Sequence, residues 1–242
     1  MSFKVVCGGQ RLSVSGHGET YSGLAILLVC LALVSCGKER PAPHTPEYRE
    51  AHGLVEGGDN RVEVSGVPFR VPSDLEFDVY SAGDIRPGKA DELTLHLFID
   101  QAGLHKGNPV PTARDSRIRV EISRMGDPNG KSYFEGGKER AEAPIVRPAL
   151  GLAEYPLKGP SAEAEYSGAY VYVPSEGPRG NGREFFCSVA WPKDPVLRNG
   201  HCRAYYYLGS GLQVRVFFEY SALVNWHVIM ETVRREVGGI QN

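Results

Sequence analysis

The sequence predicts a β-rich α+β fold that consists of antiparallel sheets and one amphipathic helix at the carboxyl end. From Arg61 onward, short alternating runs rich in β-branched and aromatic residues are separated by Gly and Pro turns. Residues 221–237 alone have apolar side chains at three- and four-residue steps, which is typical of a helix with one buried face. The 242 residues are 41% hydrophobic and 23% charged, which is the composition of a globular protein.

Each expected strand is a run of alternating polarity that ends at a turn residue. The runs are Arg61–Ser65, Pro68–Val71, Glu76–Ser81, Glu92–Asp100, Arg117–Arg124, Lys131–Glu135, Ala164–Pro174, Glu184–Trp191, Cys202–Leu208 and Gln213–Tyr220. Asp127-Pro128-Asn129-Gly130 and Gly209-Ser210-Gly211 are turn sequences, and the second predicts a hairpin between the last two strands.

The terminal helix is predicted with Ser221 as its N-cap and Gly238-Gly239 as its end. Its apolar stripe consists of Leu223, Trp226, Met230, Val233 and Val237. An amphipathic helix of this kind is expected to lie on a sheet.

Two segments of the globular part resemble one another. Residues 77–99 and 169–191 each contain a strand, a loop with acidic, Arg, Pro and Gly residues, and a second strand. Two related subdomains within residues 61–242 and a chance similarity are both open.

The amino end is predicted to be a lipoprotein signal peptide, residues 1–36. Leu24–Val34 is a run of eleven apolar residues, shorter than the roughly 20 that a membrane-spanning helix needs but typical of a signal peptide. The following sequence, Leu33-Val34-Ser35-Cys36-Gly37, resembles a bacterial lipobox. That resemblance implies cleavage before Cys36, lipidation of its thiol, and a periplasmic protein held at a membrane, for which we expect the outer membrane.

Two alternatives for this segment stay open. Lys4 and Arg11 lie far from the apolar run, with Glu19 in between. Translation therefore starts either at Met1 or downstream, in which case residues 1 to about 22 are never made. The other alternative is a short buried helix of a cytosolic protein.

Residues 37–60 are predicted to be a flexible tether. The segment is rich in Pro, Gly and charged residues and has no apolar period. An ordinary frayed terminus would have the same composition.

The cysteines support an oxidising compartment. Of five, Cys7 and Cys30 fall in the signal peptide and Cys36 is the lipidation site. Cys187 and Cys202 remain, and they lie on predicted strands on either side of one loop. If these strands pair across the loop, the two thiols lie within disulfide reach. A redox-active or metal-binding pair is disfavoured because there is no C-x-x-C motif.

Several function classes are excluded or unsupported. A net charge of −2 offers no basic field for nucleic acid. Residues 83–89 match a phosphate-loop pattern, but Ala90 and a strand follow instead of Ser or Thr and a helix. Ser210 lies in a turn rather than a nucleophile elbow. His96 and His227 are expected to be structural, and the histidine spacing supports no zinc site. We therefore expect no metal, no cofactor and no enzymatic activity.

The remaining candidate site is a partner-binding surface. Arg179, Arg183, Tyr205 and Tyr207 belong to a region rich in Tyr and Arg, the residue types enriched in interface hot spots. The loops Gly83–Asp91 and Ser175–Arg183 are further candidate recognition edges. The alternative is that the tyrosines only pack on the sheet.

The arrangement is similar to that of bacterial immunity lipoproteins, which protect cells from type VI-secreted lipase (phospholipase) effectors in the periplasm. The residues that carry the resemblance are the lipobox Leu33–Cys36, the strands Glu184–Cys187, Cys202–Tyr207 and Leu212–Phe217, and the helix with Trp226. The resemblance implies stoichiometric inhibition by binding a periplasmic lipase effector. An envelope assembly or scaffolding lipoprotein, a periplasmic small-ligand carrier and an unrecognised enzyme are the alternatives.

Overall fold

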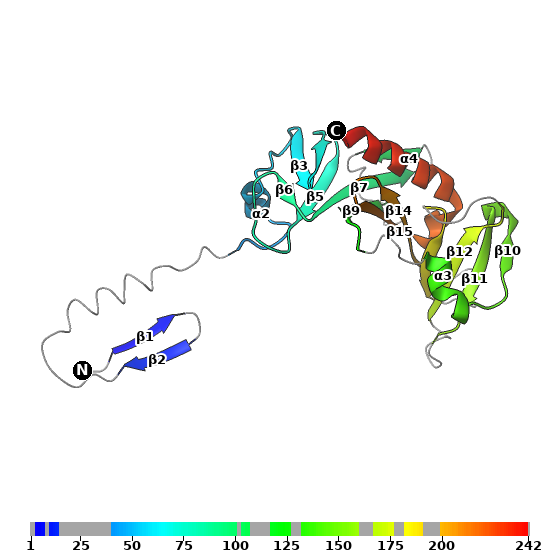
Figure 1. Cartoon of the computed structure of the whole chain (residues 1–242), viewed down its shortest axis with the longest axis horizontal. Helices are drawn as coiled ribbons and strands as arrows, with labels where there is room; N and C mark the ends of the chain where they lie inside the picture. Colours follow the sequence, from blue (N-terminus) through cyan, green and yellow to red (C-terminus); the bar gives the residue numbers. More distant parts are fainter. Residues whose placement is uncertain are drawn as a thin grey trace, which may run out of the picture. The chain divides into compact units, whose positions relative to one another are not determined.

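The structure is a computed structural model. It describes residues 3–7, 10–14, 40–100, 103–106, 117–126, 132–159, 167–176, 182–190 and 199–241. The chain forms two compact units, residues 1–40 and 41–242 (Figure 1). In the first unit, β1 (Phe3–Cys7) and β2 (Gln10–Val14) form an antiparallel hairpin, where the sequence predicted no strands. The expected apolar run and the lipidation site Cys36 lie outside the described residues.

The second unit is built on a ten-stranded antiparallel sheet, which confirms the predicted fold class. Its strand order is β10-β11-β12-β13-β14-β15-β9-β7-β5, with β8 paired to β7. The strands are β5 (Glu76–Tyr80), β7 (Glu92–Asp100), β8 (Gly103–Lys106), β9 (Arg117–Arg124), β10 (Ile145–Arg147), β11 (Leu152–Leu157), β12 (Ser167–Pro174), β13 (Phe185–Ala190), β14 (Asn199–Leu208) and β15 (Leu212–Glu219). The predicted hairpin turn at residues 209–211 joins β14 to β15.

The terminal helix is α4 (Trp226–Ile240), preceded by the 3-10 turn η5 (Tyr220–Asn225). All five residues of the predicted stripe are buried. Two predicted boundaries are wrong. Ser221 lies inside η5, and Asn225 takes the N-cap position of α4. Gly238 and Gly239 lie within the helix, which continues to Ile240 because that side chain is buried in the core.

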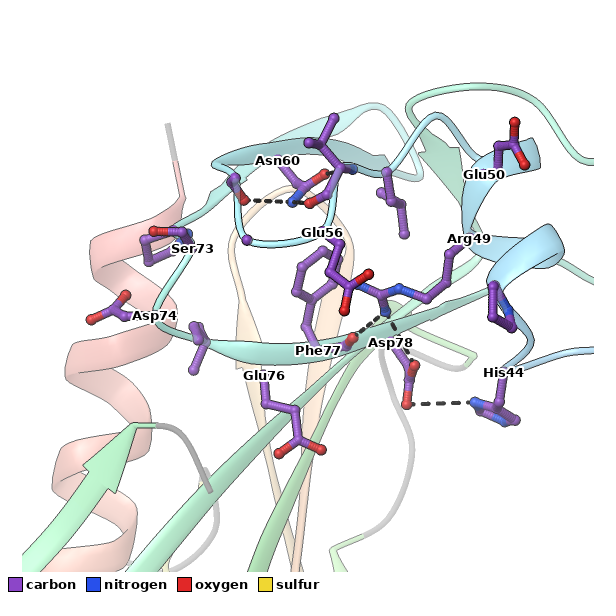
Figure 2. A pocket seen from close by; sticks show the side chains of 17 residues that line it. His44, Arg49, Glu50, Glu56, Asn60, Ser73, Asp74, Glu76, Phe77 and Asp78 are labelled. Atoms are coloured by element: carbon purple, nitrogen blue, oxygen red, sulfur yellow. Dashed lines mark hydrogen bonds and ion pairs between the residues drawn. The ribbon is translucent and has the colours of Figure 1, made fainter. Parts of the chain in front are cut away.

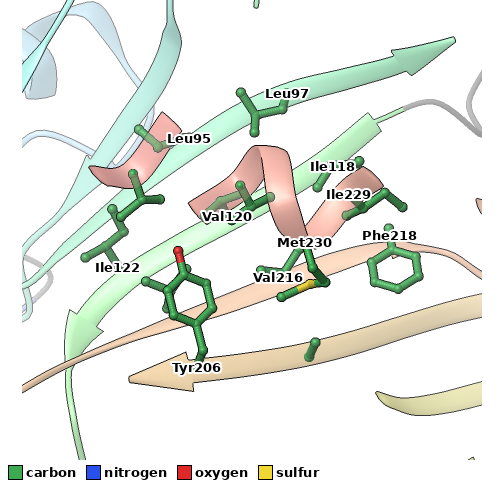
Figure 3. Close-up of a cluster of buried hydrophobic side chains, with 14 of the residues drawn as sticks. Leu95, Leu97, Ile118, Val120, Ile122, Tyr206, Val216, Phe218, Ile229 and Met230 are labelled. Carbon is green, nitrogen blue, oxygen red and sulfur yellow. The ribbon is translucent and has the colours of Figure 1, made fainter. Parts of the chain in front are cut away.

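Helix α4 covers one face of the sheet and forms the centre of the core (Figure 3). Ile229 and Met230 from the helix lie among Val120, Val216 and Phe218 from the strands below. Along β15 the buried and half-buried positions alternate strictly. Each strand therefore gives one set of side chains to this core and the other set to the opposite face.

A second, three-stranded sheet has the order β4-β3-β6, from β4 (Val67–Val71), β3 (Asn60–Val64) and β6 (Lys89–Ala90). Val62, Val64 and Phe69 are buried in the same core as the large sheet. Phe69 also bridges to Gln241 just after α4. Strand β6 falls within the loop Gly83–Asp91 that the sequence marked as a recognition edge.

The structure differs from the prediction in the middle of the tether. Residues 46–51 form helix α2 (Pro46–Ala51), where Thr45 caps the amino end by accepting from the Tyr48 N–H. Tyr48 is 1% exposed, and its hydroxyl accepts a hydrogen bond from the Ser81 N–H at 2.8 Å. His52 and Ser81 lie 2.9 Å apart between Nε2 and Oγ. The buried ring of Tyr48 and the hydrogen bonds that Tyr48 and His52 form with Ser81 therefore hold in place a segment whose composition is that of a linker.

Replacing Tyr48 by Phe tests this docking. The change removes the acceptor of the Ser81 N–H and leaves the ring in place. We expect the free energy of unfolding to fall by about 1–2 kcal/mol, measured by urea denaturation. Tyr80→Phe is the matched control, because Tyr80 is 44% exposed, and it is expected to change stability by less than about 0.5 kcal/mol. Equal stability of both variants would mean that the Tyr48–Ser81 hydrogen bond contributes nothing to the docking of α2.

The predicted strand Lys131–Glu135 is also wrong. Residues 133–137 form helix α3 (Tyr133–Gly137), with Ser132 as N-cap accepting from the Glu135 N–H at 3.2 Å. The cap outweighs the strand preference of Tyr133 and Phe134.

The two segments that resemble one another in sequence both lie in the large sheet. Residues 77–99 contain the antiparallel pair β5–β7, and residues 169–191 contain the antiparallel pair β12–β13.

Candidate functional site

The face of the large sheet opposite α4 is the candidate site, and we call it the open face. Helix α3 packs at one side of it, over β12. Its other described side chains are mostly half-buried or exposed. They include Phe186 of β13, Arg203, Tyr205 and Tyr207 of β14, Gln213, Arg215 and Phe217 of β15, Arg117, Arg119 and Glu121 of β9, Glu92 and His96 of β7, and Glu76 and Asp78 of β5.

Cations and aromatic rings alternate across four neighbouring strands of this face. The register places Phe186 opposite Arg203, Arg203 opposite Phe217, and Phe217 opposite Arg119. The Arg203 guanidinium carbon lies 4.6 Å from the centre of the Phe186 ring, and that of Arg119 lies 4.5 Å from the Phe217 ring. Such contacts hold both guanidinium groups against the sheet.

The rings of Tyr133 and Phe186 lie next to the Arg203 guanidinium, and Tyr205 and Tyr207 continue the ring contacts from Tyr133. We call these four residues the aromatic cluster. The rings of Tyr133 and Tyr205 pack edge to face at 4.8 Å, and those of Tyr205 and Tyr207 at 5.5 Å. Burial raises the pKa of Tyr133 to about 12 and raises the pKa of Tyr205 well above its usual range. Both phenols are therefore neutral at physiological pH, and Arg203 supplies the positive charge of the cluster.

The other arginines of the open face are paired with carboxylates. Arg215 Nη2 lies 2.9 Å from both Glu92 and Glu121, and Arg119 Nε lies 3.1 Å from Glu121. Burial, and next the charge of Glu92, raise the pKa of Glu121, while the two arginines lower it. The centre of the face is thus close to neutral, whereas Arg203 is exposed and makes no ion pair with a described residue.

The predicted site residues divide into three groups. Tyr205 and Tyr207 lie on the open face, as a partner-binding role requires. Arg183 is exposed two residues before β13, and Arg179 lies outside the described residues. The neighbouring tyrosines of the same region, Tyr170, Tyr172 and Tyr206, are buried on the side of α4. Those three residues pack within the core, and the hydroxyl of Tyr206 is itself buried.

Sequence reasoning missed Phe186, Phe217 and Arg119 as members of the site. They come from three strands far apart in the chain, and only the strand register brings them together. Phe186 and Phe217 each precede or follow another Phe, so the alternation left open which ring faces the core.

A charged cavity of about 630 Å³ lies at the β5 end of the sheet, between α2, the loop 54–58 and the turn 72–75 (Figure 2). Arg49 crosses it, donating from Nη1 to the Phe77 carbonyl at 2.6 Å, with its guanidinium 4.9 Å from the Phe77 ring centre. Asp78 lies 3.4 Å from Arg49 and 3.2 Å from His96. The hydrogen bond from His96 and the nearby positive charges lower the pKa of Asp78 despite its partial burial.

The rim of this cavity is held in place by Asn60, which is buried. Its side-chain oxygen accepts from the Val55 N–H at 2.7 Å, and its amide donates to the carbonyls of Val55 and Gly58. The cavity is half open and five carboxylates line it: Glu50, Glu56, Asp74, Glu76 and Asp78. A carrier of apolar ligands would need an enclosed apolar chamber with few polar groups, which this cavity is not.

Cys187 and Cys202 form the predicted disulfide and lie directly opposite on β13 and β14. Among the described residues no group of three or more His, Cys, Asp or Glu side chains could hold a metal ion. Within the same residues no helix is both long and apolar enough to span a bilayer.

No known family model matches the chain. No curated protein matches its sequence. Two solved structures are similar. One is an immunity protein of the Stenotrophomonas maltophilia type IV secretion system, with 15% identity, a TM-score of 0.47, and coverage of 77% of this chain and 94% of that one. The other is the iron-regulated outer membrane lipoprotein FrpD of Neisseria meningitidis, with 11% identity, a TM-score of 0.45, and coverage of 76% and 93%.

Proposed function

We propose that the protein is an immunity protein, a stoichiometric inhibitor of a secreted antibacterial effector in the periplasm. The observation that carries the proposal is the open face, where Arg203 and the aromatic cluster lie exposed or half-buried on or beside the central strands of the large sheet. Aromatic residues and Arg dominate the binding energy of protein interfaces. Strands that are hydrogen-bonded to a neighbour on each side lose little conformational entropy when a partner binds.

The target we propose is a type VI-secreted lipase, following the sequence resemblance. The inhibitor acts without catalysis of its own, by covering the substrate cleft or lid of the lipase. A contact of standard size buries about 1,600 Å² over both partners. Lipidation at Cys36 would keep the inhibitor at the membrane surface where a lipase attacks, and we propose the outer membrane as its location.

The test is a binding and protection experiment with the lipase effector that we expect to be encoded beside this gene. We expect a 1:1 complex by calorimetry, loss of lipase activity at equimolar inhibitor, and survival of cells that receive the effector in the periplasm. Tyr205→Ala/Tyr207→Ala should weaken the complex at least about 100-fold, as loss of two hot-spot residues does. Val228→Ala is the control, an exposed residue on α4, and should leave affinity unchanged.

Two results would contradict the proposal. One is a wild-type protein that neither binds nor inhibits the neighbouring effector. The other is an envelope defect on deletion of the gene in the absence of any attack, which is the behaviour of an assembly lipoprotein.

A further inference from the structure

Arg203 differs from every other arginine of the open face in its electrostatic surroundings. Arg119 and Arg215 have carboxylates within 3.1 Å. Arg117 likewise pairs with Glu76 at 3.1 Å. Arg203 has rings instead: Phe186 at 4.6 Å and Tyr133 at 5.6 Å from its guanidinium carbon. Rings hold the guanidinium plane in position without neutralising it.

The position of Arg203 decides what happens to it in a complex. It stands on β14, directly opposite Phe186 on one side and Phe217 on the other. Arg203, Tyr205 and Tyr207 occupy alternate positions of β14 and so lie on the same face. A partner that covers Tyr205 and Tyr207 therefore covers Arg203 as well. Arg203 forms no ion pair with any residue that the structure describes, and removing such a guanidinium from water is costly unless the partner supplies an anion. The neighbouring tyrosines cannot supply it, because their phenols are neutral at physiological pH. The nearby Glu184 carboxylate, which is buried, accepts from the Phe134 N–H at 3.1 Å instead.

Resting on the proposed function, we infer that the effector presents an Asp or Glu carboxylate to Arg203, and that this pair is the central anchor of the complex. The planar fork of a guanidinium binds a carboxylate through two parallel hydrogen bonds. Rings that already fix the guanidinium reduce the entropy lost when the pair forms. Since Arg119 and Arg215 each form ion pairs with carboxylates of the sheet, the partner needs one such carboxylate at this point and no acidic patch.

Calorimetry of the purified mature protein with the effector tests the inference. Arg203→Lys keeps the charge and loses the fork, so we expect about 10-fold weaker binding. Arg203→Glu places two carboxylates together and should weaken binding more than about 1,000-fold. Arg235→Glu is the matched control, because this side chain on α4 is 66% exposed, and it should bind as the wild type does. Equal thermal midpoints of the variants establish that each is folded.

A charge swap identifies the partner group. In the effector, each interface Asp or Glu is changed to Arg, and one of these changes should restore binding to Arg203→Glu by at least about 100-fold. If wild type binds and Arg203→Glu binds equally well, the inference is overturned while the proposed function stands. If wild type does not bind at all, both fall.

The other candidate source of an anion for Arg203 is the phosphate of a lipid. Binding to lipid vesicles tests this alternative. The mature protein without a lipid is mixed with phosphatidylglycerol and phosphatidylcholine vesicles and sedimented. We expect no binding that depends on Arg203. Vesicle binding that Arg203→Glu abolishes and Arg235→Glu does not would assign Arg203 to the membrane and overturn the inference.

Discussion

Trp226→Ala is expected to lower the free energy of unfolding by about 3–5 kcal/mol, a large fraction of the total stability of a globular domain. The indole packs edge to face on Phe185 at 5.2 Å and donates from Nε1 to the Leu150 carbonyl at 2.9 Å. It therefore joins the first turn of α4 both to strand β13 and to the segment before β11. Removing it opens a cavity and leaves a carbonyl without its donor. Urea denaturation measures the loss.

Two variants separate the causes of that loss. Trp226→Phe keeps most of the ring packing and removes the hydrogen bond, so it should cost less than Trp226→Ala, by at least about 1 kcal/mol. Val228→Ala changes an exposed side chain of the same helix and should alter stability by less than about 0.5 kcal/mol. If Trp226→Ala were as stable as Val228→Ala, the helix would not be anchored at its amino end.

The second large effect is expected from the disulfide. Cys187→Ala/Cys202→Ala should lower the free energy of unfolding by about 3 kcal/mol in oxidising buffer, because the bond closes a loop with a sequence separation of 15 and restricts the unfolded chain. Both cysteines are in the core, so the variant also loses some packing.

Reduction provides the control for the packing loss. Wild-type protein unfolded in the presence of a reductant lacks the crosslink but keeps both thiols. The difference between wild type and variant should therefore shrink to the packing contribution alone. If wild type and variant had the same unfolding midpoint in oxidising buffer, the disulfide would not stabilise the protein.

The sequence predicted the strands best where polarity alternates over a long run. The bounds of β7 and β9 were predicted correctly, because Leu93, Leu95 and Leu97, and then their partners on β9, alternate with polar residues. Helix α2 was missed because six residues with one buried side chain have no period to detect. Strand β11 was missed because Pro156 interrupts it, and a proline usually excludes a strand.

The candidate site was predictable in part. Tyr205 and Tyr207 could be marked because Tyr is concentrated in residues 205–207. Their alternation with the buried Tyr206 also determines which of the three share a face. The cation and ring partners, Phe186 and Phe217, needed the register of three strands. The charged cavity at β5 could not be predicted, because one of its walls comes from a segment whose composition indicated a linker.

The strand order also determines when the fold can be completed during synthesis. Within the large sheet, β15 pairs with β9 on one side and β14 on the other, so it joins the strands β5, β7 and β9 to those from β10 to β14. Until residues 212–219 are available, the chain consists of two partial sheets, each with an unsatisfied edge at β9 or β14. Contacts between such distant segments form slowly. A chain truncated before β15 would present both edges to other chains, and pairing of those edges is a route to aggregation. The segment from β15 to the end of α4 thus converts two aggregation-prone halves into one continuous sheet.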